Sequence, residues 1–269
     1  MEGDKRKPRS GVQSVEQGAR ILTAFASVRG PVSLTELSRA VGMPPGKVHR
    51  YLVSLGRSGL VEQQPVTGKY ELGPLSLRIG LSAIGALDPI RYASEALPRL
   101  RDVIGHTILL TIWGDRGPTV IRLEESGDSI TMNMRVGSVL SVLTTAIGRV
   151  FLTYLPRSTT QKLIDEERDR KDGAHSRGRI PGLDPDSISA EVRRHGLAAI
   201  DSAMLPNVVA VAAPVFDYQR ALVAVVGTTG LKPLLDTRPD GPVARALLDT
   251  TASISGRLGF DAGAVPAPG

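Results

Sequence analysis

The sequence predicts an α+β protein of two domains: a small helical domain that ends in a β-hairpin, then a larger domain of antiparallel strands flanked by helices. Three observations support this prediction. The chain has 269 residues, more than a typical single domain. Apolar side chains in residues 13–57 repeat with the period of a helix, whereas residues 107–124 and 208–228 hold runs rich in β-branched residues. The net charge is also divided unevenly between the two parts.

The first domain opens with two predicted helices. Residues 13–27 place apolar side chains on one face of a helix. A second helix begins at Leu34, because Ser33 and Glu36 have the spacing of a capping box, in which each side chain bonds a free backbone amide near the start of the helix. Gly42 then ends this helix, since glycine tolerates the backbone conformation in which helices terminate.

A third helix follows, and its two faces differ in character. Pro44 and Pro45 start it, because proline is tolerated in the first turn of a helix. Its inner face is apolar and carries Val48, Tyr51, Leu52 and Leu55. A cationic helix held across a short turn from another helix is typical of a helix-turn-helix recognition element. A basic face that contacts only solvent is the alternative.

A hairpin completes this domain. Gly59 ends the third helix, and short strands are predicted at 61–64 and 69–72 around a turn at 65–68. Three helices followed by such a hairpin form a winged helix-turn-helix, which we place at residues 11–73.

The expected DNA-contacting residues come from the third helix and the hairpin. Arginine and lysine contact guanine or phosphate, and a glycine at the start of the helix permits close approach to DNA. For the two hairpin residues, an ordinary surface position is the alternative. The candidates are Gly46, Lys47, His49, Arg50, Ser54, Arg57, Gln63 and Lys69.

The charge distribution agrees with this assignment. Residues 1–70 hold 11 Lys and Arg against 5 Asp and Glu, whereas residues 71–269 hold 22 of each. The whole net charge of +6 therefore lies in the first part, as expected when one domain binds phosphates and the other does not. Residues 1–10 are predicted to be a disordered basic arm that either contacts DNA or is a solvated tail.

Composition also indicates the compartment. The chain has no cysteine and hence no disulfide, which fits a reducing cytosol. No apolar run reaches transmembrane length, and residues 1–12 lack the apolar core of a signal peptide. We therefore expect a cytoplasmic protein with no membrane partner.

Residues 74–88 are predicted to form a linker helix. Leu77, Leu81 and Ile84 fall on one face of it, and this face has no obvious partner inside a winged helix. We expect it to pack on a second copy of the chain, because a two-fold dimer matches a pseudo-palindromic DNA site.

The second domain, residues 89–260, begins with a helix that Asp88 caps and in which Pro98 predicts a kink or a break. A further helix is predicted at 144–155, with Thr144 near its cap. Residues 157–183 are polar and contain a loop at 171–182. The remaining predicted helices are 185–195 and 242–258, and the predicted strands are 107–113, 119–124, 130–134, 208–215 and 222–228. Five or six antiparallel strands flanked by helices make an α+β domain, followed by a flexible tail at 261–269.

No catalytic constellation is found. The four histidines lie on separate predicted elements without metal-ligand spacing, and neither a nucleophile motif nor a glycine-rich phosphate loop is present. We predict that the protein is not an enzyme and binds no metal or cofactor.

Several segments resemble the IclR family of bacterial transcription regulators. GVQSVEQGARILTAFA, SLTELSRAVGMPPGKVHRYLVSL, GLVEQ and KYELG resemble its DNA-binding end. GSVLSVLTTAIGRVFLTYLP and RRHGLAAIDSAMLPNVVAVAAPVFDYQRALVAVVGTTG resemble its effector domain. The resemblance implies a GAF-like sensor fold for residues 89–260. The family usually has a Ser/Thr pair where this chain has Gly46 and Lys47, so the base contacts are expected to differ.

The resemblance also implies an effector cavity. Residues 141–148 open a helix whose N-terminus suits a small anion, although small packing residues are the alternative. Family ligands are often small carboxylates or aromatic acids. The implied lining residues are Thr145, Ala146, Gly148, Asp201, Val211, Thr228 and Thr229.

These observations lead to one main hypothesis and two alternatives. The main hypothesis is a homo-oligomeric regulator, a dimer or tetramer, that binds a pseudo-palindromic operator in double-stranded DNA and senses a small organic acid or aromatic catabolite. The first alternative is a constitutive or architectural DNA-binding protein whose C-terminal domain only oligomerises. The second is a metabolite-binding enzyme with an auxiliary DNA-binding domain.

Overall fold

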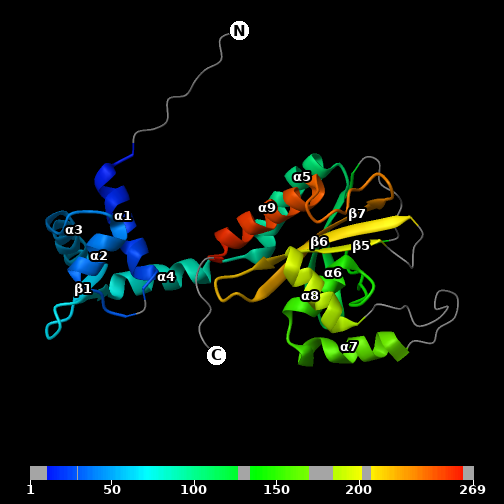
Figure 1. Cartoon of the computed structure of the whole chain (residues 1–269), viewed down its shortest axis with the longest axis horizontal. Helices are drawn as coiled ribbons and strands as arrows, with labels where there is room; N and C mark the ends of the chain where they lie inside the picture. The colour runs from blue at the N-terminus through cyan, green and yellow to red at the C-terminus, as the bar shows by residue number, and fades with distance from the viewer. Residues whose placement is uncertain (1–10, 29, 127–133, 170–183, 202–206, 263–269) are drawn as a thin grey trace, which may run out of the picture. The chain divides into compact units, whose positions relative to one another are not determined.

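The computed structural model divides into two compact units, one up to Leu87 and one from Asp88 onward (Figure 1). The predicted basic arm and most of the predicted tail lie outside the residues that the structure describes, which are 11–28, 30–126, 134–169, 184–201 and 207–262.

The first unit is a winged helix. Its elements are α1 (Gln13–Ala26), α2 (Leu34–Val41), α3 (Pro45–Arg57), β1 (Val61–Gln63), β2 (Tyr70–Leu72) and α4 (Pro74–Gly85). Strands β1 and β2 pair in antiparallel register. The helices and the hairpin enclose one core, formed by Ile21, Phe25, Val32, Leu37, Val41, Met43, Val48, Leu52, Val61 and Tyr70. The predicted winged helix-turn-helix is therefore confirmed.

The capping box at the start of α2 is confirmed in detail. The amide of Glu36 donates to Ser33 Oγ, while the amide and the hydroxyl of Ser33 both donate to the Glu36 carboxylate. These hydrogen bonds hold the pKa of Glu36 below its ordinary value. At the other end of α2, Gly42 adopts a φ of 64°, which explains why glycine ends this helix.

Loss of this cap is expected to destabilise the first unit. Replacing Ser33 by Ala leaves the amide of Glu36 without its side-chain partner, so the free energy of unfolding should fall by about 1 kcal/mol. The pKa of Glu36 is lower in the folded protein than in the unfolded chain. Its carboxylate therefore stabilises the fold at pH values above the unfolded pKa, and this stabilisation is lost as the pH falls through the folded pKa. Chemical denaturation at neutral and acidic pH measures both effects. An Ser33→Ala variant as stable as the parent at neutral pH would contradict this prediction.

Helix α4 differs from every other described helix because none of its residues is buried. Its large apolar side chains are exposed to between 40% and 64%: Leu77, Ile79, Leu81 and Ile84. The helix is stable locally because Pro74 lies in its first turn and Ser76 Oγ donates to the carbonyl of Leu60 at 2.7 Å. Its apolar face has no partner within the described part of this chain.

The second unit is built on a five-stranded antiparallel sheet in the order β4-β3-β7-β6-β5. Its strands are β3 (Thr107–Gly114), β4 (Gly117–Glu124), β5 (Ala198–Asp201), β6 (Val208–Phe216) and β7 (Leu222–Leu231). The predicted strand at 130–134 falls almost wholly on residues 127–133, which the structure does not describe. The α+β architecture of this domain is confirmed.

Helices cover both faces of this sheet (Figure 1). Helices α5 (Pro89–Ile104) and α9 (Pro242–Arg257) pack on one face, and α6 (Ala146–Tyr154) packs on the other, followed outward by α8 (Pro185–His195) and α7 (Arg157–Asp169). Gly227 permits close packing on the α6 face, because a Cβ there would lie 2.9 Å from the side chain of Ile147. Gly227 therefore lies on the face of the sheet that packs against α6.

The structure corrects three local predictions and refines a fourth. Residues 157–169 form helix α7, although their polar composition predicted no helix, and strand β5 was not predicted. Helix α5 continues through Pro98, because one missing hydrogen bond does not outweigh the burial of Leu97 and Leu100 beside it. The cap of α6 is Thr145, directly after Thr144, which the sequence placed near the cap; Thr145 Oγ1 accepts from the amide of Gly148 at 2.9 Å.

Candidate DNA-binding surface and effector domain

The outer face of α3 presents basic side chains that have no partner within the described residues. Val48 and Leu52 are buried beneath it, so the helical period turns the polar positions outward. His49, Arg50 and Arg57 are exposed, Lys47 is half-buried, and none of these side chains forms a hydrogen bond or ion pair within the described residues. They remain available for a partner.

Two further candidates on α3 have different surroundings. Ser54 is exposed and its Oγ donates to the backbone carbonyl of Arg50 at 3.2 Å. A Cβ added at Gly46 would meet no atom within 4 Å, so packing within this unit does not require a glycine there. An absent side chain at an exposed helix start leaves room for close approach of another molecule.

Contacts from α1 and α2 hold the recognition helix in place. Arg20 of α1 donates through Nη2 to the carbonyl of Val41 at 3.0 Å, directly before the turn into α3. Met43 follows in that turn, is buried, and donates its amide to the carbonyl of Ser38 at 3.1 Å. The turn between α2 and α3 is thus fixed by a side chain and a backbone bond that sequence reasoning did not identify.

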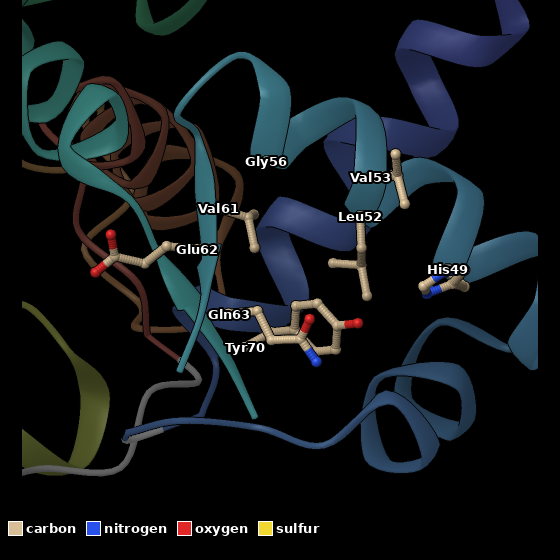
Figure 2. Close-up of a pocket in the computed structure, with 8 residues that line it drawn as sticks. All are labelled: His49, Leu52, Val53, Gly56, Val61, Glu62, Gln63 and Tyr70. Carbon is tan, nitrogen blue, oxygen red and sulfur yellow. The ribbon is translucent and has the colours of Figure 1, made fainter. Parts of the chain in front are cut away.

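The hairpin wing lies beside α3 and encloses a hollow with it. Gln63 Nε2 donates to the carbonyl of Gly68 at 2.8 Å, which ties the tip of the wing, and Lys69 is exposed next to it. The hollow has a volume of about 290 Å³ (Figure 2). It is lined by His49, Leu52, Val53, Gly56, Val61, Glu62, Gln63 and Tyr70. Two of the DNA-contact candidates, His49 of α3 and Gln63 of the wing, therefore border the same hollow.

In the second unit, the start of α6 is tightly packed. Ala146 and Gly148 are buried, and a Cβ at Gly148 would lie 2.6 Å from the Cα of Val142. A methyl group cannot fit at that distance, so Gly148 is required by the backbone that passes beside it. This is the packing role that the sequence left as the alternative for these small residues.

Within the predicted anion site at 141–148, the amides of Val142 and Leu143 are not free. Glu167 accepts from the amide of Val142 at 2.7 Å, from the amide of Leu143 at 3.0 Å and from Ser141 Oγ at 2.7 Å. Glu167 belongs to α7 and lies on its inner face, together with the buried residues Thr160 and Ile164. The chain thus supplies its own carboxylate to these amides.

Replacing Glu167 by Gln should loosen this loop. The glutamine amide group is itself a donor and cannot accept from both backbone amides, so the free energy of unfolding of the second unit should fall by about 1–2 kcal/mol. Thermal unfolding measures the loss, and hydrogen exchange should report reduced protection at Val142 and Leu143. Glu166→Gln is the matched control, because its side chain is 48% exposed on the same helix. Equal stability of the two variants would contradict the role of Glu167.

The seven implied effector residues do not share one face of the sheet. Gly227 faces α6, so the alternation along β7 places Thr229 on the α6 face and Thr228 on the opposite face. Val211 is the register partner of Thr228 and therefore lies on the face away from α6. Asp201 pairs with Val209, which lies two residues before Val211 on β6, so Asp201 is on that same face. The structure therefore does not bring all seven residues to one face of the sheet, because neighbouring strand residues point in opposite directions.

The same set also differs in burial and partners. Thr228 Oγ1 donates to the carbonyl of Thr107 and Thr229 Oγ1 to the carbonyl of Val209, and Val211 is fully buried. Asp201 is exposed at the end of β5 and forms an ion pair with Lys232, a residue that sequence reasoning missed. The pair neutralises the aspartate charge at this end of the sheet.

A half-buried arginine supports the loop before α6. Arg149 Nε donates to the carbonyl of Leu143 at 3.0 Å. Burial lowers the pKa of Arg149, and the nearby Glu191 opposes this shift. Arg149 and Glu167 therefore bind opposite backbone groups of the same segment, the carbonyl and the amide of Leu143.

Neither a metal-binding cluster nor a membrane-spanning helix is found in the part of the chain that the structure describes. No group of three or more His, Asp or Glu side chains there has a geometry that would hold a metal ion. None of the described helices has the length and apolar character needed to span a bilayer.

A winged helix with unpaired cations on its recognition helix, joined to a separate α+β domain, defines the class of DNA-binding transcription regulators. Comparison with known proteins identifies the family. A model of the IclR helix-turn-helix domain matches residues 14–65, and a model of the C-terminal domain of the bacterial transcriptional regulator IclR matches residues 81–256. The chain belongs to the IclR family, whose members are transcriptional regulators and not enzymes.

Relatives match along nearly the whole chain. The glycerol operon regulatory protein of Streptomyces coelicolor is 27% identical over 92% of this chain and 97% of its own length. The crystal structure of Pseudomonas aeruginosa HmgR is 38% identical, with a TM-score of 0.83 over 93% of this chain and 100% of that one. An IclR homolog from Microbacterium hydrocarbonoxydans, solved in complex with 4-hydroxybenzoate, is 16% identical with a TM-score of 0.52 and shares the fold.

Proposed function

We propose that this protein is a ligand-responsive regulator that binds a pseudo-palindromic operator as a dimer. In this proposal the second unit binds a small organic acid or aromatic catabolite, and the binding changes the affinity of the first unit for DNA. Such a protein acts in the cytoplasm, where its operator is found.

The unpaired cations of α3 carry the proposal. Arg50 and His49 are exposed without partners in the described structure, and Lys47 lies beside them near the start of the helix. N-terminal residues of a recognition helix contact base edges in the major groove. Lys69 and Gln63 at the wing and Arg57 at the end of α3 are proposed phosphate contacts.

The exposed apolar face of α4 supports the dimer. A helix with no buried residue gains little from packing in its own chain, and contiguous exposed apolar surface is typical of a protein interface. A two-fold pair of winged helices then presents two recognition helices to two half-sites of a palindrome.

The effector is proposed to bind on the α6 face of the sheet. Thr229 lies on that face, and Thr145 and Ala146 begin the helix that covers it. Asp201, Val211 and Thr228 belong to the other face, so we assign them no direct contact. The 4-hydroxybenzoate found with a family member of the same fold makes this acid a suitable first probe.

Fluorescence anisotropy tests the proposal. The protein is first allowed to select duplexes from a random-sequence pool, and the selected duplex is titrated against a scrambled one with and without a mixture of small carboxylic and aromatic acids. Specific binding that shifts with the acids is expected, because an effector typically changes affinity by about 5- to 150-fold. Specific binding that ignores every acid would favour the constitutive regulator, and salt-sensitive binding without sequence preference would favour the architectural protein.

A further inference from the structure

Two glutamates face each other across the strands of the wing. Glu62 of β1 and Glu71 of β2 are register partners, so their side chains lie on the same face of the hairpin with Cβ atoms about 5 Å apart. Glu62 is exposed and Glu71 is half-buried. Like charges directly opposite each other destabilise a pair of strands.

No cation relieves this repulsion within the described residues. Neither carboxylate forms an ion pair there. The donor bound to Glu71 is neutral: Gln64 Nε2 lies 3.2 Å from each of its carboxylate oxygens. The wing therefore carries two carboxylates side by side without a cationic partner in the described structure.

The two faces of the wing differ in charge. Val61 and Tyr70 are buried in the core shared with α3, and Gln63 points toward the hollow beside α3. Glu62 also lines the hollow, but its carboxylate points away from it (Figure 2). Lys69 lies next to the tip, where Gln63 bonds Gly68. Donors thus gather at the tip and on the side of α3, and carboxylates occupy the outer face.

The different charges on the two faces of the wing should affect how the protein binds DNA. The cations of α3 attract phosphates whatever the base sequence, and a genome offers about 10⁶–10⁹ competing non-specific sites. We propose that Glu62 and Glu71 are specificity-determining residues, which repel the phosphate backbone from the outer face of the wing. DNA contact is then limited to α3 and the wing tip. The repulsion mainly weakens binding modes in which the outer face of the wing approaches phosphates, and such modes differ from the one on the operator.

The test is the double variant Glu62→Gln with Glu71→Gln, in the full-length protein. Glutamine keeps the size of both side chains, and removal of like charges leaves the hairpin at least as stable, which thermal unfolding checks. Fluorescence anisotropy is measured on a duplex that the parent protein selects from a random pool and on a scrambled duplex, across a salt titration. We expect about fivefold tighter binding to the scrambled duplex and less than about twofold to the selected one. The slope of log affinity against log salt for the scrambled duplex should steepen by about one.

A matched control separates local repulsion from net charge. Asp165→Asn with Glu166→Gln on α7 changes the charge by the same amount in the other unit and should leave both affinities unchanged. An equal gain in this control would overturn the proposal, as would unchanged binding or equal gains on both duplexes in the wing variant. Loss of affinity for the selected duplex alone would also overturn it, since the carboxylates would then accept hydrogen bonds from bases.

Discussion

Replacing Arg50 by Ala is expected to weaken binding to a selected operator duplex by about 10- to 100-fold while affecting scrambled DNA much less. Arginine donates two hydrogen bonds to one guanine, and such a contact is worth about 1–3 kcal/mol of discrimination. Arg50 is exposed on the outer face of α3 and has no partner in the described structure, so its removal should leave the fold intact. Anisotropy on both duplexes at fixed salt, together with thermal unfolding, measures these effects.

A suitable control is Arg116→Ala in the turn between β3 and β4. Arg116 is exposed and lies in the second unit, so the variant loses the same charge away from the proposed surface. If Arg50→Ala binds the operator as the parent does, Arg50 makes no base contact. If it weakens both duplexes equally, Arg50 contacts phosphate instead.

Introducing charges on the apolar face of α4 should abolish the dimer. The variant Leu77→Glu with Leu81→Glu places two carboxylates where the proposed interface excludes water, and burial of unpaired charges is strongly unfavourable. Sedimentation velocity should show a monomer at micromolar concentration. Operator affinity should fall by about 100-fold or more, because two linked recognition helices bind far more tightly than one.

Arg78→Glu with Ser82→Glu is the control on the same helix, and it adds more negative charge than the Leu77/Leu81 variant does. Both residues are exposed and lie beside the Leu77, Leu81 and Ile84 face, not on it, so this variant should remain dimeric. Circular dichroism should be unchanged for both variants, since α4 contributes no buried residue. A Leu77/Leu81 variant that stays dimeric would place the interface elsewhere.

Local signals predicted the first unit well. The capping box of Ser33 and Glu36, the two prolines before α3 and the glycine after α2 act on neighbouring residues, so sequence spacing alone determines their geometry. Exposure of the α3 candidates also followed from the helical period. The contact of Arg20 with Val41 spans 21 residues, and no local pattern indicates it.

The second unit shows where such reasoning fails. Helix α7 has only two buried residues, so its sequence lacks a clear apolar stripe, and without that helix the carboxylate of Glu167 had no predicted position. Strand β5 has four residues, too few for a clear alternation. The family resemblance grouped Val211 and Thr228 with residues of α6. Which face of the sheet these two residues occupy depends on the register between strands far apart in sequence, and no local pattern gives that register.

Close packing at Gly148 restricts how the proposed effector site could be adapted to new ligands. A library that seeks altered effector preference should leave position 148 fixed, because any side chain there overlaps the backbone of residues 141–142. Diversity is better placed at Thr145 and at the sheet positions that face α6, Ala210 and Thr229. Positions 145, 210 and 229 can therefore be varied in such a library, whereas position 148 must remain glycine.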